Sequence, residues 1–148
     1  MTKAAFRIRE VDGPYAAEYI ELMHAVCMPE VELPAIDDGC WWLAYAGKEP
    51  VAYASLHPSQ RYRNVGYLSI VGVLPSARGN GLQRRLIKVR ENKAKKLGWN
   101  ILITDTIPEN PASSNNLIKS GYVTYVPERP WKVEGALYWR KYLSGGEG

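Results

Sequence analysis

The sequence predicts a mixed α/β protein whose elements follow the order β-α-β-β-β-α-β-α-β-β. Apolar residues recur at helical spacing in a few segments, and short runs rich in β-branched and aromatic residues lie between those segments. The composition agrees, because 46% hydrophobic and 23% charged residues over 148 positions are typical of a globular chain with its own core. We therefore expect a single domain over residues 1–143 and a flexible tail at residues 144–148.

The first half of the chain is expected to hold one helix, a hairpin and a further strand. Pro14 opens a helical segment at residues 15–27. The short stretch 47–49 joins two strand-like runs and indicates a hairpin. The apolar residues that carry the helical period are Tyr15, Tyr19, Leu22 and Val26. The strands are expected at residues 6–10, 41–46, 50–56 and 64–74.

The second half begins with the longest helical pattern of the chain. This pattern runs from residue 79 to residue 97, and Gly98 ends it as a C-terminal cap. Residues 101–103 are apolar without polar alternation, as expected of a strand in the interior of a sheet. A shorter helix is expected at residues 113–119. The closing strands are expected at residues 122–126 and 136–143.

Composition and charge exclude several classes of protein. No apolar stretch approaches the ~18 residues of a membrane span, and the first residues lack the apolar region of a signal peptide, so we expect a cytoplasmic protein without membrane contact. Cys27 and Cys40 form no CxxC pair, and His24 and His57 have no ligand cluster around them, so no metal site is expected. The net charge of +4 suits a nucleic acid, a phosphorylated cofactor or simple solubility equally well.

The segment Val71-Gly-Val-Leu-Pro-Ser-Ala-Arg-Gly-Asn-Gly-Leu82 places a strand, a glycine-containing turn and the long helix in succession. Backbone N–H groups at a helix start point outward, and glycines let that backbone approach a phosphate. The segment therefore predicts pyrophosphate binding by main-chain donors, with a purely structural turn as the alternative. It fits neither the phosphate-binding loop of nucleoside triphosphatases nor the dinucleotide fingerprint.

The same segment resembles the coenzyme A loop of the GCN5-related N-acetyltransferases (GNATs). A second block supports the resemblance, because Asn110 stands eleven residues before Gly121-Tyr122, the spacing of that family's Asn…Gly-Phe/Tyr segment. The resemblance covers residues 38–143. It implies a mixed, mostly antiparallel sheet of about six to seven strands flanked by helices. It also implies direct acetyl transfer from acetyl-CoA to a primary amine of a small molecule or peptide.

The resemblance also implies which residues contact the cosubstrate. Main-chain groups of the segment 70–73, with Gly72 as a bulge, would polarise the thioester carbonyl. The residues implied to bind acetyl-CoA are Val71, Val73, Arg78, Gly79, Asn80, Gly81, Leu82, Gln83, Arg84, Asn110, Ser113 and Asn116.

Three residues are candidates for catalysis. Asp105 stands five residues before Asn110, where related ribosomal-protein N-terminal acetyltransferases carry a glutamate, which implies a general base. An exposed acid at a strand end, or a cap for the following turn, is the alternative. Tyr67 and Ser69 occupy alternate strand positions and could hold a bridging water, or be ordinary strand residues. His57 has a suitable unperturbed pKa but is expected to be a surface residue.

The sequence departs from the family pattern in two places. Ser76 replaces a usual Gln or Arg, which removes one side chain from the loop. Leu117 replaces a tyrosine that protonates the departing thiolate in many relatives, so we expect this role to be unfilled or moved, with Ser113 and Ser114 as candidates.

Alternative functions and the acceptor side stay open. A non-catalytic acyl-CoA-binding protein is one alternative. Another is binding of nucleic acid or an acidic partner by the basic helix, although the glycine loop argues against it. Trp131 could lie beside an acceptor groove. The acids between residues 30 and 38 could attract a cationic amine. We expect a monomer or a homodimer.

Overall fold

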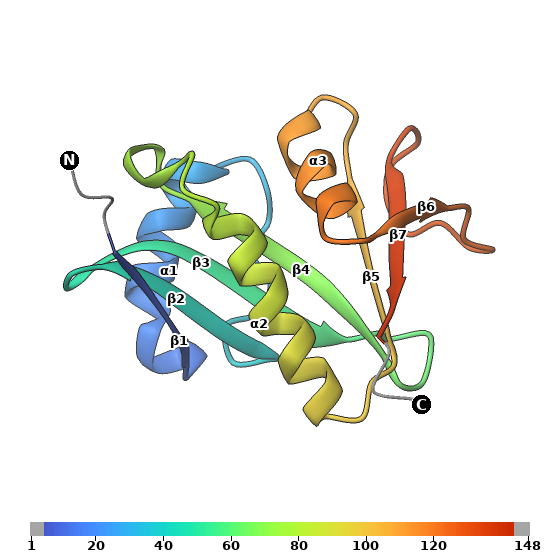
Figure 1. The fold of residues 1–148 in the computed structure, drawn as a ribbon, viewed down its shortest axis with the longest axis horizontal. Helices are drawn as coiled ribbons and strands as arrows, with labels where there is room; N and C mark the ends of the chain where they lie inside the picture. Colours follow the sequence, from blue (N-terminus) through green and yellow to red (C-terminus); the bar gives the residue numbers. More distant parts are fainter. Residues whose placement is uncertain (1–4, 144–148) are drawn as a thin grey trace. The chain divides into compact units, whose positions relative to one another are not determined.

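The computed structural model of this protein describes residues 5–143, so the tail predicted at residues 144–148 lies outside the described residues (Figure 1). The predicted order of strands and α-helices is observed, with one short 3-10 helix before α2. The elements are β1 (Phe6–Val11), α1 (Gly13–Cys27), β2 (Cys40–Ala46), β3 (Glu49–Pro58), β4 (Val65–Val73), η1 (Pro75–Ala77), α2 (Leu82–Lys96), β5 (Ile101–Thr106), α3 (Pro111–Lys119), β6 (Val123–Tyr125) and β7 (Leu137–Tyr142).

The strands form one seven-stranded sheet in the described part of the chain, in the order β1-β2-β3-β4-β5-β7-β6. Strand β2 pairs antiparallel with both β1 and β3, and β7 pairs antiparallel with both β5 and β6. Strands β4 and β5 run parallel, with Val65–Tyr67 opposite Ile101–Ile103. The expected mixed, mostly antiparallel sheet is therefore confirmed.

The described residues form two compact units. Unit 1 holds residues 5–57 and 69–86, and unit 2 holds residues 58–68 and 87–143. The division falls within β4 and α2 and before Pro58, the last residue of β3, so each of these elements contributes to both units. A single domain over residues 1–143 stays a prediction.

In unit 1, α1 covers one face of β1–β3 (Figure 1). The helix begins at Gly13, two residues earlier than predicted, because the Asp12 carboxylate accepts a hydrogen bond from the Tyr15 N–H at 3.1 Å. The residues buried against one another are Ala16, Ile20, Met23, Trp41, Leu43, Tyr53 and Ile70. The apolar residues whose spacing predicted this helix lie on its exposed side and not in the core. Tyr15, for example, is 88% exposed.

In unit 2, β5 lies between β4 and β7. Strand β5 is longer than predicted, since its pairing with β7 continues to Thr106. The second half of α2 carries a buried acid, Glu91, which accepts hydrogen bonds from the Tyr122 hydroxyl at 2.9 Å and from the Lys141 ammonium at 3.1 Å. The neighbouring Arg90 is also buried, and burial lowers its pKa to about 10. None of the helices among residues 5–143 is long and apolar enough to cross a membrane.

Candidate acetyl-transfer site

The loop before α2 has the backbone geometry that phosphate binding requires. Gly79 and Gly81 have φ angles of +81° and +75°, in the left-handed region that favours glycine. A Cβ added at either position would meet nothing within 4 Å among the described residues. Residues with these φ angles cannot belong to a right-handed helix, so α2 begins at Leu82 and not at residue 79 as predicted. The first bond at its start joins the Arg85 N–H to the Gly81 carbonyl, so the preceding amides lie outside the helical ladder.

Side chains of the loop hold it in shape. The Asn80 amide donates to the carbonyls of Ala77 and Arg78, at 2.9 and 3.2 Å. The Arg78 guanidinium donates to the carbonyl of Val73, the last residue of β4, at 3.0 Å. Leu82 is buried and anchors the start of α2. Of the other residues implied to contact acetyl-CoA, Arg84 and Asn110 are exposed, whereas Val71, Val73, Gln83, Ser113 and Asn116 are half-buried.

Strand β4 is irregular in its second half. Tyr53, Ser55 and His57 alternate along β3 and therefore face one side of the sheet. The Ser55 hydroxyl contacts Ser69, and the Tyr53 ring occupies the space that a Cβ at Gly72 would need. Ser69 and Gly72 thus face the same side although they are three positions apart, which an unbroken strand does not allow. A bulge at Gly72 that serves the thioester stays a prediction.

A hydrogen-bonded cluster lies on β3 and β4 in unit 1. His57 Nδ1 contacts the Ser69 hydroxyl, which also accepts a hydrogen bond from the Ser55 hydroxyl at 3.0 Å. The other ring nitrogen, Nε2, is buried and makes no hydrogen bond of ideal geometry among the described residues, whereas backbone groups of Ala35 and Asp38 interact with the ring. His57 is therefore half-buried and not the surface residue that its position at a strand end suggested.

The surroundings of His57 are compact. Gly39 adopts a φ of +71°, and a Cβ at this position would collide with the imidazole. The Trp41 ring packs edge-on at 6.1 Å between ring centroids. Burial lowers the pKa of His57, and the negative charge of Asp38, with the backbone of Asp38 and Ala35, acts in the opposite direction.

A second cluster surrounds Asp105 in unit 2. Its Oδ2 accepts hydrogen bonds from the Tyr67 hydroxyl at 2.5 Å and from the Trp131 indole N–H at 2.9 Å. The Lys132 ammonium lies 4.0 Å from Oδ1. The Trp131 ring also packs against Tyr138, with centroids 4.6 Å apart. Burial and the Asp105 charge raise the pKa of Tyr67, so this phenol keeps its proton. Of the three predicted catalytic residues, Tyr67 and Asp105 thus meet, whereas Ser69 contacts His57.

Two of the residues implied to contact acetyl-CoA, Asn110 and Ser113, have a structural role at the start of helix α3. The Asn110 carbonyl Oδ1 accepts a hydrogen bond from the Ser113 N–H at 3.3 Å and caps the helix. The Ser114 hydroxyl lies 3.1 Å from the Thr106 hydroxyl. Leu117, which stands where many relatives carry a tyrosine, is buried at 5% exposure.

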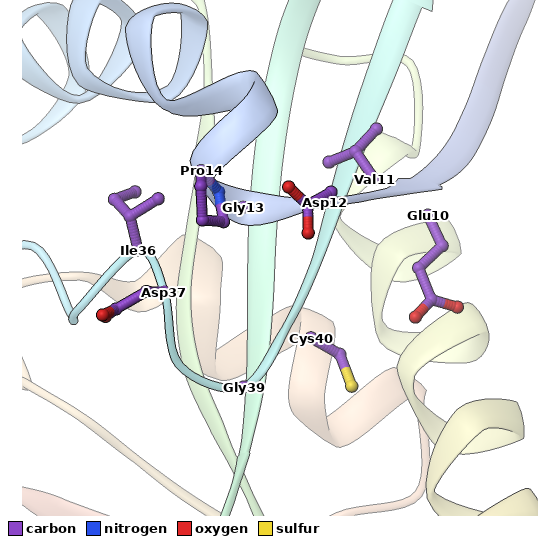
Figure 2. Close-up of a pocket in the computed structure, with 9 residues that line it drawn as sticks. All are labelled: Glu10, Val11, Asp12, Gly13, Pro14, Ile36, Asp37, Gly39 and Cys40. Atoms are coloured by element: carbon purple, nitrogen blue, oxygen red, sulfur yellow. The ribbon is translucent and has the colours of Figure 1, made fainter.

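A hollow of about 350 Å³ lies at the end of β1 and the start of α1 (Figure 2). Arg85, in the first turn of α2, contacts the carbonyl of Phe6 at the start of β1, whereas the hollow lies at the end of that strand. Its lining residues are Glu10, Val11, Asp12, Gly13, Pro14, Ile36, Asp37, Gly39 and Cys40. Figure 2 shows Asp37 on the opposite side of the hollow from Glu10. With three carboxylates, the hollow is unsuited to a phosphate.

The family model described as the acetyltransferase (GNAT) family matches residues 9–122, which include the glycine loop and Asp105. The chain belongs to the GNAT family. Acetyl transfer is thus the general activity that its fold supports. No curated protein sequence matches the chain. Among residues 5–143 of this GNAT protein, no group of three His, Cys, Asp or Glu side chains is arranged to hold a metal ion.

Solved structures agree on the fold. A Bacillus subtilis acetyltransferase in complex with CoA has a TM-score of 0.76 at 15% identity, and the match covers 94% of this chain and 99% of that one. YncA from Salmonella typhimurium, with its cofactor acetyl-CoA, has a TM-score of 0.74 at 19% identity over 97% of both chains. A GNAT-family acetyltransferase from Streptococcus pneumoniae has a TM-score of 0.72 at 19% identity, over 94% of this chain and 99% of that one.

Proposed function

We propose that this GNAT protein transfers the acetyl group of acetyl-CoA to a primary amine of a small molecule or a peptide, by direct attack of the amine on the thioester. The observation that carries the proposal is the loop at residues 78–82, where two glycines with positive φ precede the start of α2. The relatives from Bacillus subtilis and Salmonella typhimurium, described with CoA and acetyl-CoA, support the choice of cosubstrate.

The residues of the loop fit a pyrophosphate. The Arg78 N–H already donates to the Pro75 carbonyl at 3.3 Å, so the amides that follow it, up to residue 83, are the main-chain donors assigned to the pyrophosphate. The two glycines leave the space before them open. Arg84 in the first turn of α2 is exposed and adds positive charge. The irregular segment at residues 70–73 supplies the main-chain donors that polarise the thioester carbonyl.

On the acceptor side, Asp105 is assigned the role of general base, which takes the first proton from the ammonium group of the acceptor. Only a neutral amine has the lone pair that attacks the carbonyl carbon. Tyr67 and Trp131 both donate to Oδ2 and hold this carboxylate in one orientation. Oδ1, which lies 4.0 Å from the Lys132 ammonium, is the oxygen that we assign to the acceptor. The general acid that protonates the departing thiolate stays unassigned, since Leu117 cannot donate a proton.

The test is an assay with a panel of primary amines that differ in size and charge. Release of free thiol from acetyl-CoA is followed for each amine, and the product mass is measured. We expect amine-dependent thiol release and a product heavier by one acetyl group. Binding of acetyl-CoA without turnover of any amine would favour the non-catalytic acyl-CoA-binding alternative. We further propose a cytoplasmic protein that is a monomer or a homodimer and uses no nucleic acid partner.

A further inference from the structure

The oxygen that we assign to the acceptor, Asp105 Oδ1, faces a positive charge of the protein itself. The Lys132 ammonium lies 4.0 Å from it. We propose that Lys132 competes with the acceptor, because its ammonium holds the place of the acceptor ammonium at Oδ1 and must leave when an acceptor binds. This inference rests on the proposed role of Asp105 as the base for an amine. It makes Lys132 a residue that sets the affinity for the acceptor.

The Asp105 carboxylate favours a cation beside it. Its side chain is only 15% exposed, so water compensates little of its negative charge. The two close donors to Oδ2, the Tyr67 hydroxyl and the Trp131 indole N–H, are neutral groups. Their hydrogen bonds orient the carboxylate but bring no positive charge to it. Lys132 supplies that charge on the side of Oδ1.

The backbone around Lys132 is fixed, which places its side chain beside the carboxylate. The Lys132 N–H donates to the Tyr138 hydroxyl at 3.0 Å. The preceding Trp131 packs its ring against Tyr138, with centroids 4.6 Å apart. Tyr138 in turn lies directly opposite Asp105 in the pairing of β5 with β7. Residues 131 and 132 are therefore tied to the two strands that hold the carboxylate.

The ammonium of Lys132, in contrast, can leave. Its distance of 4.0 Å from Oδ1 exceeds the length of about 2.7–2.9 Å of a direct charge-assisted hydrogen bond. The side chain is 47% exposed, and its four-carbon stem is flexible. An acceptor ammonium that reaches hydrogen-bond distance of Oδ1 makes the stronger contact. The Lys132 ammonium then moves into solvent while the backbone of residue 132 keeps its place.

The exchange has consequences for binding and for release. One positive charge replaces another beside Asp105, and the cost of breaking the pair lowers the affinity for the acceptor. Acetylation converts the ammonium into an amide, which is neutral and cannot compensate the carboxylate. The return of Lys132 to Oδ1 therefore favours departure of the product. Asp105, Lys132 and the aromatic residues around them all belong to unit 2.

The experiment measures the dissociation constant of n-butylamine, a primary alkylammonium at neutral pH, by NMR titration without acetyl-CoA. Lys132→Met removes the charge and keeps an unbranched stem. It should bind n-butylamine about 2- to 5-fold more tightly than the parent, which is the usual contribution of an exposed ion pair. The affinity should also become more sensitive to salt, because the carboxylate is then uncompensated. Lys132→Arg keeps the charge and should not bind more tightly than the parent.

Two comparisons separate competition from a structural role or a general effect of net charge. Lys119 is an exposed lysine at the end of α3, in the same unit, and Lys119→Met should leave the dissociation constant unchanged. In an Asp105→Asn background, Lys132→Met should bring no gain, because no carboxylate is left to release. In turnover, Lys132→Met should lower the KM for the most active amine of the panel by the same factor and leave the KM for acetyl-CoA unchanged.

The outcomes are distinguishable. Equal affinities of the parent and Lys132→Met overturn the inference, as does a gain of the same size in the Asp105→Asn background. Absence of n-butylamine binding to both proteins also overturns it. These constants need no turnover, so a parent that shows the expected binding but acetylates no amine overturns the proposed transfer and leaves the competition at Asp105 standing. Should Lys132→Met not fold, Lys132→Gln takes its place in both backgrounds.

Discussion

Among single residues, Tyr53 has a tightly constrained side chain in unit 1. It is fully buried, its hydroxyl lies 2.6 Å from His24 Nδ1, and its ring fills the space beside Gly72. Burial raises the pKa of Tyr53, so the phenol stays protonated and donates to His24. A glycine at position 72 is thus required by packing, independently of any role in the reaction.

Gly72→Ala tests this packing. The added methyl group would overlap the Tyr53 ring, whose movement would break its hydrogen bond to His24. We expect the free energy of unfolding to fall by about 1–3 kcal/mol, the usual range for an overpacked core. Urea denaturation measures the change. Parent-like stability would show that the ring does not lie against residue 72.

His57 should also make stability depend on pH. Its pKa in the folded state lies below the unfolded value of about 6.5, so the unfolded chain binds this proton more readily. The resulting stability is complete above about pH 6.5 and is lost as pH falls toward the lowered pKa. Unfolding free energies of the parent and of His57→Gln at several pH values should therefore differ in slope below pH 6.5. Parallel curves would contradict the buried, neutral imidazole.

At the scale of elements, the glycine loop can be tested with a matched pair. Gly81 and Gly47 have φ angles of +75° and +62°, and a Cβ on either meets nothing within 4 Å among the described residues. Aspartate at either position thus brings similar backbone strain, but only Gly81→Asp places a carboxylate at the proposed pyrophosphate site. We expect it to weaken acetyl-CoA binding roughly 100-fold or more in calorimetry, since like charges in contact cost several kcal/mol. Equal affinities of the two variants would contradict the site.

The order of elements could be predicted because periodicity and turn residues are local signals. Gly98 was expected to end a helix, and it follows α2 with a φ of +83°. The start of α2 was predicted three residues early, because helical periodicity does not reveal that glycines have positive φ. The spacing of apolar residues predicted helix α1 but not its buried face, which includes Ala16, Ile20, Met23 and His24.

The candidate site could be predicted only in part. The loop and Asp105 were found because each belongs to a short motif. The contact between His57 and Ser69 joins two strands, and no local pattern marks it. Tyr67 and Asp105 are 38 positions apart, and their hydrogen bond likewise depends on the pairing of β4 with β5. Trp131 reaches Asp105 from the segment between β6 and β7, where the sequence shows no periodicity.

For the molecule as a whole, the uneven distribution of charge matters more than its net value of +4. Within unit 1, Arg78, Arg84 and Arg85 are exposed around the glycine loop, whereas Glu30 and Glu32 are exposed in the segment after α1. His24 Nε2 contacts the carbonyl of the intervening Val31 at 2.6 Å, which ties the backbone between the two acids to α1. Such a separation suits an anionic cosubstrate and a cationic acceptor.

Glu30→Gln combined with Glu32→Gln tests the acidic segment. We expect the KM for amines with a second positive charge to rise and to become less sensitive to salt, because the local attraction is removed. The KM for acetyl-CoA should stay the same. The matched control replaces Glu18 and Glu21, two exposed acids on α1. If the two double variants have the same KM values for cationic amines and for neutral amines, the acidic segment has no part in recognition.

The hydrogen bond from Trp131 to Asp105 has an optical consequence. Indole fluorescence responds to the charge and hydrogen bonding at its N–H, and among the five tryptophans Trp131 is the one shown to donate to this carboxylate. An amine that binds Asp105 should therefore shift the emission spectrum of the protein, even without acetyl-CoA. Trp131→Phe should abolish the shift, and an unchanged shift in that variant would assign it to another indole. With this signal, acceptors can be ranked by titration before any turnover is measured.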